Sequence, residues 1–155
     1  MRDTSDTNLI TLLGQICRLE HARSHELFEE LGLYRGQHRI LRALWMQDGL
    51  THTELSEYAH VKPATISTTI QRMEAAGLIE RRQDTEDQRV SRVFLAETGR
   101  GLQEDVVRMS DRIEEEVFTD FTAEERMLLR RFFIQMCENL MQVTDGRHQH
   151  RGRRH

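Results

Sequence analysis

The sequence predicts a mainly helical α+β fold with one small β-hairpin. Only one proline, Pro63, occurs in the 155 residues, so helices can run long and a sandwich or barrel with many turns is disfavoured. Two capping-box patterns, Thr51–Glu54 and Thr122–Glu125, mark helix starts. After Gly77 the apolar spacing changes from that of a helix to that of a strand, and it returns to helical spacing at Thr98-Gly99.

The first two helices follow from apolar spacing and turn signals. Thr7-Asn8 can cap a first helix that runs to about Leu31 and ends at Gly32. A second helix is expected over about residues 35–47, ahead of the turn signal Asp48-Gly49. Its apolar residues are Ile40, Leu41, Leu44 and Trp45.

A pair of shorter helices follows. The Thr51 hydroxyl can accept from the Glu54 amide while the Glu54 carboxylate accepts from the Thr51 amide, which starts a third helix that ends near His60. Pro63 suits the first position of a fourth helix, because the N–H that it lacks would be unpaired there. Gly77 is a natural left-handed cap after this helix. The inward residues of the third helix are expected to be Leu55, Tyr58 and Ala59.

The rest of the chain is a hairpin followed by two helices. Strands are predicted over residues 78–82 and 90–95, joined by a polar loop that contains no glycine. A long helix is expected from Thr98-Gly99 to about Phe118, and a last helix from Thr122 to about Val143. The tail from Gly146 is rich in arginine and histidine and has no apolar residue, which predicts disorder.

The order of the central elements predicts a DNA-binding protein. Two short helices joined by a tight turn, the second followed directly by a hairpin, form the winged helix-turn-helix pattern. In the fourth helix, Ile66, Ile70 and Met73 share one face. The opposite face is short or polar and has no acid between Lys62 and Arg72, so it can approach the floor of a major groove. The residues predicted to contact DNA there are Lys62, Ala64, Thr65, Thr68, Thr69, Gln71 and Arg72.

The hairpin is predicted to be a second DNA contact. Arg81 and Arg82 on one strand, with Arg89 and Arg92 near the other, can reach phosphates or enter a narrow minor groove. Asp87 is close enough to Arg89 in the sequence to orient its guanidinium. The alternative, an ordinary surface hairpin with charge pairs, is disfavoured by the helix pair that precedes it.

The charge of the chain supports DNA binding less than the order and spacing of its elements do. The net charge is −4, whereas a nucleic-acid binder is expected to be basic. Between Arg100 and Asp120 three arginines stand against seven acids, and from Lys62 to Leu95 six basic residues stand against five acidic ones. The acid is thus concentrated away from the predicted DNA face, and that face is close to neutral.

The hairpin and the helix pair resemble the MarR family of bacterial transcription regulators. The wing signature is carried by Leu78-Ile79-Glu80-Arg81-Arg82-x-Asp84-x-x-Asp87-x-Arg89-x-x-x-Val93-x-Leu95-x-x-Thr98-Gly99. The helix-turn-helix resemblance is carried by Thr51-x-x-Glu54-Leu55 and Pro63-Ala64-Thr65-Ile66-Ser67. The resemblance spans essentially the whole chain and departs at Ala96, where the family usually has threonine.

This resemblance implies a cytoplasmic regulator of a bacterium or archaeon, a repressor that acts as a homodimer on a pseudo-palindromic duplex. The expected segments are an N-terminal dimerisation helix (1–34), the winged helix-turn-helix (35–99), C-terminal dimerisation helices (100–145) and the basic tail (146–155). The sequence supports dimerisation independently, because the last helices carry more apolar surface than a small monomer buries comfortably. Those residues are Phe118, Phe121, Leu128, Leu129, Phe132, Phe133, Met136, Leu140 and Met141.

The resemblance also implies a small-molecule effector, aromatic or phenolic, that enters a cleft between the dimerisation helices and the DNA-binding domain and shifts the population of DNA-binding states. The candidate residues are Arg18, His21, His25, His38, Arg42 and Trp45. No resident cofactor and no metal site are predicted. Metal sensing stays an alternative, because His21 and His25 have the i, i+4 spacing of two metal ligands and His38 could supply a third.

The cysteines and the termini bear on the cellular compartment. Cys17 and Cys137 lack CxxC spacing, which favours a reducing cytosol. Cys17 falls in an apolar stripe and is expected to be buried, although peroxide-sensing relatives use a first-helix cysteine, which keeps redox sensing as an alternative. Cys137 is expected in the core. No apolar run is long enough for a membrane span, and the N-terminus lacks the form of a signal peptide.

Two other classes of protein have less support from the sequence. An enzyme is disfavoured, because the chain has no glycine-rich phosphate loop, no GxSxG and no metal-hydrolase motif, so no catalytic residue is predicted. A winged-helix module that binds protein instead of DNA remains an alternative because of the acidic net charge.

Overall fold

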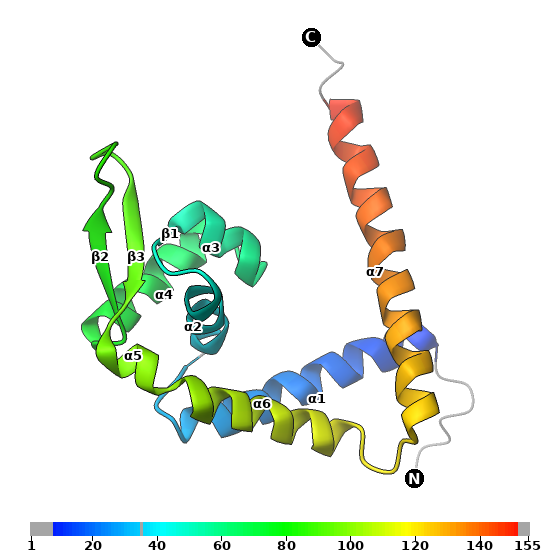
Figure 1. Ribbon diagram of the computed structural model, residues 1–155. Coiled ribbons are helices and arrows are strands. Elements are labelled where there is room, and N and C mark those ends of the chain that lie inside the picture. The colour runs from blue at the N-terminus through cyan, green and yellow to red at the C-terminus, as the bar shows by residue number, and fades with distance from the viewer. Residues whose placement is uncertain (1–7, 35, 152–155) are drawn as a thin grey trace. The chain divides into compact units, whose positions relative to one another are not determined.

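The computed structural model describes residues 8–34 and 36–151 and divides into two compact units, residues 1–114 and 115–155. The first unit contains α1 (Leu9–Glu29), α2 (Gln37–Met46), β1 (Leu50–Thr51), α3 (His52–Ala59), α4 (Pro63–Ala75), β2 (Ile79–Gln83), β3 (Ser91–Leu95), α5 (Glu97–Gly101) and most of α6 (Gln103–Val117) (Figure 1). The second contains the end of α6 and α7 (Ala123–Arg151). The predicted mainly helical fold with a small β element is confirmed. Thr7 and Arg35, expected at two helix starts, lie outside the described residues.

The sheet has one strand more than the sequence predicts. Its order is β1-β3-β2, with antiparallel pairing that sets Leu50 opposite Val93 and Arg82 opposite Arg92. The strand β1 has only two residues, which is too short for an alternating pattern to be visible. The hairpin of β2 and β3, called the wing below (residues 79–95), extends beyond the neighbouring helices (Figure 1).

Local sequence signals set the helix starts as predicted. The Asn8 side chain accepts from the Ile10 amide at 2.8 Å. In the first capping box the Thr51 amide donates to Glu54 Oε2 at 2.7 Å and the Glu54 amide donates to Thr51 Oγ1 at 3.2 Å. The second capping box, Thr122 with Glu125, has the same two bonds at 2.8 and 3.2 Å. Each box pairs backbone N–H groups that a helix start leaves unsatisfied.

The turn between α3 and α4 places the second helix of the motif. His60 has φ +52°, in the left-handed region, and the Ser56 hydroxyl donates to the Val61 carbonyl at 2.5 Å. Pro63 is the first residue of α4, and Gly77, with φ +71°, follows that helix as predicted. A turn this short fixes the direction of α4 relative to α3.

The core of the first unit is built from one face of each element. It includes Leu27 and Phe28 of α1, the predicted Ile40, Leu41 and Leu44 of α2, Leu55 of α3, Ile66, Ile70 and Met73 of α4, Val93 of β3 and Val106 of α6. The inward position predicted for Tyr58 is wrong, since that side chain is 43% exposed and its hydroxyl lies 2.9 Å from Met46 Sδ. A phenol keeps access to water more easily than an aliphatic side chain does.

The helix expected from Thr98 to Phe118 is divided at Leu102 into α5 and α6. At Gly99 the chain passes so close to the residue before β2 that an added Cβ would lie 2.1 Å from the Leu78 carbonyl oxygen. The Trp45 indole N–H donates to the Gly99 carbonyl at 3.1 Å. Ala96, the N-cap of α5, makes no side-chain capping bond, so the departure from the family's threonine leaves this helix start uncapped by a side chain.

Within the second unit α7 leaves its large apolar side chains exposed. They include Leu128 (47%), Phe132 (45%) and Leu140 (67%). Cys137 is also exposed, so its predicted core position is wrong for the single chain. The helix continues past Val143 to Arg151, so residues 146–151 are helical rather than disordered. Arginine and glutamine are good helix formers, and a single glycine costs only about 1 kcal/mol. Residues 152–155 lie outside the described part.

Candidate nucleic-acid interface

Helix α4 has two faces of different chemistry. Ile66, Ile70 and Met73 are at most 1% exposed and anchor the helix in the core. The remaining face, called the outer face of α4, carries the residues predicted to contact DNA. Of these, Lys62 (the N-cap), Ala64, Thr65, Thr68, Gln71 and Arg72 are exposed and Thr69 is half-buried. The face is therefore accessible along its length while the helix itself is fixed.

The hydroxyl groups on α4 are already oriented by the helix. Ser67 Oγ donates to the Pro63 carbonyl at 3.2 Å, Thr68 Oγ1 to Ala64 at 3.3 Å and Thr69 Oγ1 to Thr65 at 2.8 Å. A hydroxyl that donates its one proton keeps two lone pairs. Thr68 can therefore accept a hydrogen bond from a base edge while its own proton stays satisfied.

Two cations of the outer face are available for phosphates. Within the described part of the chain, neither Lys62 nor Arg72 is in an ion pair. A cation that has no carboxylate partner loses no existing pair when it binds a phosphate oxygen.

The arginines of the wing differ from this arrangement. Arg81 on β2 is held by Glu74 of α4, with Nε to Oε2 at 2.8 Å and Nη2 to Oε2 at 2.6 Å. Arg82 pairs with Glu80 at 2.9 Å and lies 4.8 Å from the centroid of the Phe94 ring. Both guanidinium groups were expected to reach DNA, but each already has a partner within the chain.

Among the wing arginines, Arg92 has two partners in different parts of the chain, Asp84 and Gly49. Its Nε donates to Asp84 Oδ2, and its Nη1 donates to the Gly49 carbonyl at 3.0 Å. Asp84 also accepts from the amides of Glu86 at 2.8 Å and Asp87 at 3.1 Å. These hydrogen bonds, with the Arg92 donation the largest contribution, lower the pKa of Asp84 to about 2. Arg92 therefore joins the wing loop to the residues before β1.

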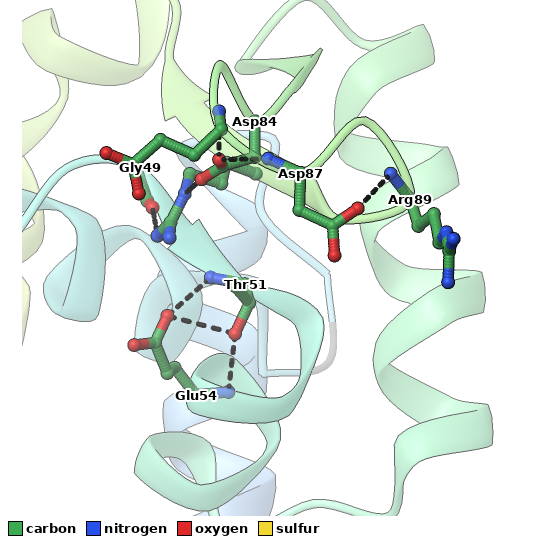
Figure 2. A network of polar contacts seen from close by, with 8 residues as sticks. Gly49, Thr51, Glu54, Asp84, Asp87 and Arg89 are labelled. Carbon is green, nitrogen blue, oxygen red and sulfur yellow. Dashed lines mark hydrogen bonds and ion pairs between the residues drawn. The ribbon is translucent and has the colours of Figure 1, made fainter.

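Arg89 is the exception among the wing arginines. The Asp87 carboxylate accepts from the Arg89 backbone N–H at 3.0 Å rather than from the guanidinium, as Figure 2 shows. The prediction that Asp87 orients the guanidinium is therefore wrong in this structure, because the short spacing favours a local turn bond to the backbone. Arg89 is exposed and, among the described residues, has no ion-pair partner.

The predicted effector residues lie on α1 and α2. His38 stacks on Phe28 with ring centroids 4.0 Å apart, and burial, followed by Arg39, Arg42 and His21, lowers the His38 pKa to about 4. His21 Nδ1 donates to the Cys17 carbonyl at 2.8 Å, and its Nε2 lies 3.5 Å from Arg39 Nη2. The remaining candidates comprise the exposed Arg18, His25 and Arg42 and the half-buried Trp45.

The metal and redox alternatives differ in how the described residues bear on them. No group of three His, Cys, Asp or Glu side chains able to hold a metal ion occurs in the described part of the chain. Cys17 is exposed, so the expectation of a buried thiol is wrong for the single chain. Cys17 lies in the middle of α1, whereas the core residues of that helix, Leu27 and Phe28, lie in its last turns. Redox sensing stays an untested alternative.

The partners of the wing arginines, in ion pairs and hydrogen bonds, were not predicted from the sequence. Glu74, Glu80, Asp84 and the Gly49 carbonyl were not predicted as parts of the site. Alternation along β2 indicates that Glu80 and Arg82 share a face, so that pair was detectable. The bond between Arg92 and Gly49 spans 43 positions and has no local signal.

Comparisons with known proteins agree with this geometry. The model of the MarR family matches residues 33–91. An uncharacterised HTH-type transcriptional regulator of Bacillus subtilis, YwoH, is 31% identical over 126 residues, which cover 81% of this chain and 91% of that protein. That match extends well beyond the winged helix into the flanking helices.

Two solved structures share the fold. One is a MarR mutant from E. coli complexed with operator DNA, with a TM-score of 0.76, 19% identity and coverage of 83% of this chain and 92% of that one. The other is Bordetella bronchiseptica BpsR, whose structure concerns regulation of DNA binding by 6-hydroxynicotinic acid, with a TM-score of 0.77, 22% identity and coverage of 86% and 96%. No described helix is long and apolar enough to cross a membrane. By its sequence relatives and its fold, the chain belongs to the MarR family of helix-turn-helix transcriptional regulators.

Proposed function

We propose that this protein binds a pseudo-palindromic DNA duplex as a homodimer and represses transcription, with α4 in the major groove and the wing at the minor groove. The outer face of α4 carries the proposal. It offers Lys62 and Arg72, which are in no ion pair within the described residues, and hydroxyl acceptors between them, on a helix held by a buried apolar stripe. Arg89 supplies an exposed cation at the wing tip that pairs with no carboxylate in the part of the chain that the structure describes. The operator complex of the E. coli relative supports this arrangement by analogy of fold.

Exposed apolar side chains support the dimer. In the first unit, the N-terminal half of α1 exposes Leu9 (81%), Ile10 (73%) and Leu19 (63%). In the second unit, α7 exposes Phe132, Leu140 and their apolar neighbours. Large apolar side chains that a helix leaves exposed in such number favour a protein–protein interface, and a two-fold dimer presents two copies of α4 to two half-sites.

The direct test is binding of the purified protein to the duplex upstream of its own gene, measured by fluorescence anisotropy over a range of salt concentrations. We expect the affinity to fall steeply with salt, because phosphate contacts release counterions. Arg72→Gln removes one phosphate contact from each protomer, so the plot of log K against log salt should be less steep by about 1.8 for the dimer. The matched control is Arg108→Gln, which removes the same charge from a pair with Asp105 on α6. Absence of duplex binding at low salt would favour the protein-binding alternative.

We further propose an anionic aromatic effector that binds near α1 and α2. The support is the group of basic side chains around His21, Arg39 and Arg42, beside the stacked rings of Phe28 and His38. BpsR, whose DNA binding responds to 6-hydroxynicotinic acid, is a precedent of the same fold. A carboxylate can pair with the guanidinium groups while a ring packs on an aromatic face.

Trp45 provides the measurement, because it is the only tryptophan in the sequence and lies on α2. Titration with 6-hydroxynicotinate or salicylate should change its fluorescence and weaken duplex binding over the same concentration range. Arg42→Gln should raise the concentration needed for both effects, whereas Arg108→Gln should leave it unchanged. A fluorescence change without any effect on duplex binding would contradict an effector role.

A further inference from the structure

The wing contains a graded set of arginine–carboxylate pairs. In the pair of Arg82 with Glu80 the side chains are 60% and 55% exposed, and in the pair of Arg81 with Glu74 they are 39% and 33% exposed. In the pair of Arg92 with Asp84 the exposures fall to 37% and 14%. An exposed pair exchanges its partner at little cost, whereas a shielded, multiply bonded pair does not.

Asp84 is the centre of the most shielded pair. One oxygen, Oδ1, accepts from the backbone amides of Glu86 and Asp87, and the other, Oδ2, accepts from Arg92 Nε. Arg92 in turn donates to the Gly49 carbonyl at 3.0 Å. If Arg92 turned to a DNA phosphate it would lose both partners and would leave the Asp84 charge without its cation. A phosphate contact therefore has to replace two existing hydrogen bonds.

The surroundings of Asp84 also set the position of the wing tip. The two amides that donate to the Asp84 carboxylate lie in the loop just before Arg89. Figure 2 shows Asp84, Asp87 and Arg89 following one another along this loop. One carboxylate thus shapes the turn that carries the exposed arginine and also pairs with the arginine on β3.

We infer that Asp84 is a specificity-determining positioning residue, an internal counter-ion that keeps Arg92 off the DNA backbone, so that the wing contacts DNA through Arg89 and not through Arg92. This inference rests on the proposed DNA binding. It also accounts for the near-neutral charge between Lys62 and Leu95, because carboxylates there cancel arginines that would otherwise bind any duplex. Reduced attraction to non-operator DNA raises the ratio of specific to non-specific affinity.

The first experiment compares Asp84→Asn with Glu86→Gln. Each variant removes one negative charge from the wing loop. Of these two carboxylates, Asp84 forms an ion pair with an arginine, and Glu86 forms none among the described residues. Asparagine keeps an oxygen for the two loop amides. For Asp84→Asn we expect tighter binding to a duplex of unrelated, non-operator sequence and a salt slope steeper by about 1.8, as one added phosphate contact in each protomer of the dimer requires. Glu86→Gln should leave the salt slope at the wild-type value.

The second experiment begins with single arginine variants, which do not depend on the folding of the Asp84 variant. With the duplex upstream of the protein's own gene as the operator, Arg92→Gln should leave the salt slope unchanged, whereas Arg89→Gln should reduce it by about 1.8 for the dimer. In the double variant Asp84→Asn/Arg92→Gln the slope should return to the wild-type value, which would assign the added contact to Arg92.

The inference is overturned if Arg92→Gln alone reduces the slope by about 1.8, or if Asp84→Asn binds both duplexes with the wild-type slope. In either case wild-type binding to the operator would remain, and the proposed function with it. A wild-type protein that binds no duplex at low salt would overturn the proposed function and this inference together.

Discussion

Helices α4 and α7 are both rich in apolar residues, but only α4 buries them. In α4, Ile66, Ile70 and Met73 are at most 1% exposed, whereas in α7 Leu128, Phe132 and Leu140 are between 45% and 67% exposed. The same chain therefore covers the apolar side chains of α4 but leaves those of α7 exposed. Stability that depends on α4 should therefore be independent of protein concentration, and stability that depends on α7 should increase with it.

The largest expected effect is that of Ile70→Ala in α4. Removal of a fully buried isoleucine side chain should lower the free energy of unfolding by about 2–5 kcal/mol, the usual cost of lost burial and of the cavity. The measurement is urea denaturation at two protein concentrations that differ by a hundredfold. Ser67→Ala on the exposed side of the helix is the control and should change stability little. A loss that appears only at the lower concentration would remove the contrast between the two helices.

The second prediction concerns Phe132→Glu in α7. A charge placed within a dimer interface should weaken dimerisation by at least about a hundredfold, or about 2.7 kcal/mol. Light scattering after size-exclusion chromatography should show monomer at micromolar concentration. Gln142→Glu introduces the same charge at a polar position of the same helix and should stay dimeric. If the wild type itself is a stable monomer, the dimer proposal fails.

The third prediction uses His38, whose folded-state pKa of about 4 lies below the ordinary value of 6.5. Between these two pH values the unfolded chain binds a proton that the folded chain does not, so stability should fall as the pH decreases from about 6.5 towards 4. The loss should be on the order of 1–3 kcal/mol. His38→Gln should flatten this part of the stability profile, and the control His25→Gln, at an exposed position, should retain it. Equal profiles for the wild type and His38→Gln would contradict the buried, neutral histidine.

The smallest effect is expected on the outer face of α4. Thr68→Val keeps the shape of the side chain but removes the hydroxyl acceptor, so preference among bases should change more than total affinity. Selection from a randomised half-site should show altered enrichment at one or two positions, with a salt slope equal to that of the wild type. Thr119→Val, at an exposed threonine after α6, is the control. An unchanged preference would exclude Thr68 from base recognition.

Much of the fold was predictable because its signals are local. Each capping box spans four residues, Pro63 is its own helix-start signal, and Gly77 lies one residue after the C-cap of α4. The strand β1 was not predictable, because its two residues are strand-like only in being paired with β3. The break at Leu102 was likewise missed, because the sequence there continues in helical spacing.

The site was predictable to a smaller extent. The accessible face of α4 follows from helical periodicity, since a buried stripe implies an opposite exposed face. Which wing arginines are available does not follow, because Arg81 pairs with a residue of another element and Arg92 with a carbonyl far away in sequence. Cys17 and Cys137 are exposed in the single chain. Their burial in an assembly depends on what covers α1 and α7, which the sequence does not state.

The close approach at Gly99 has a consequence for which sequences can adopt this fold. The smallest possible side chain there would collide with the Leu78 carbonyl, and backbone cannot move aside as the end of a flexible side chain can. Gly77 differs, because its left-handed backbone is one that asparagine also adopts and no atom lies within 4 Å of an added Cβ. In a library of all single variants, position 77 should retain asparagine among its survivors, whereas position 99 should retain glycine alone.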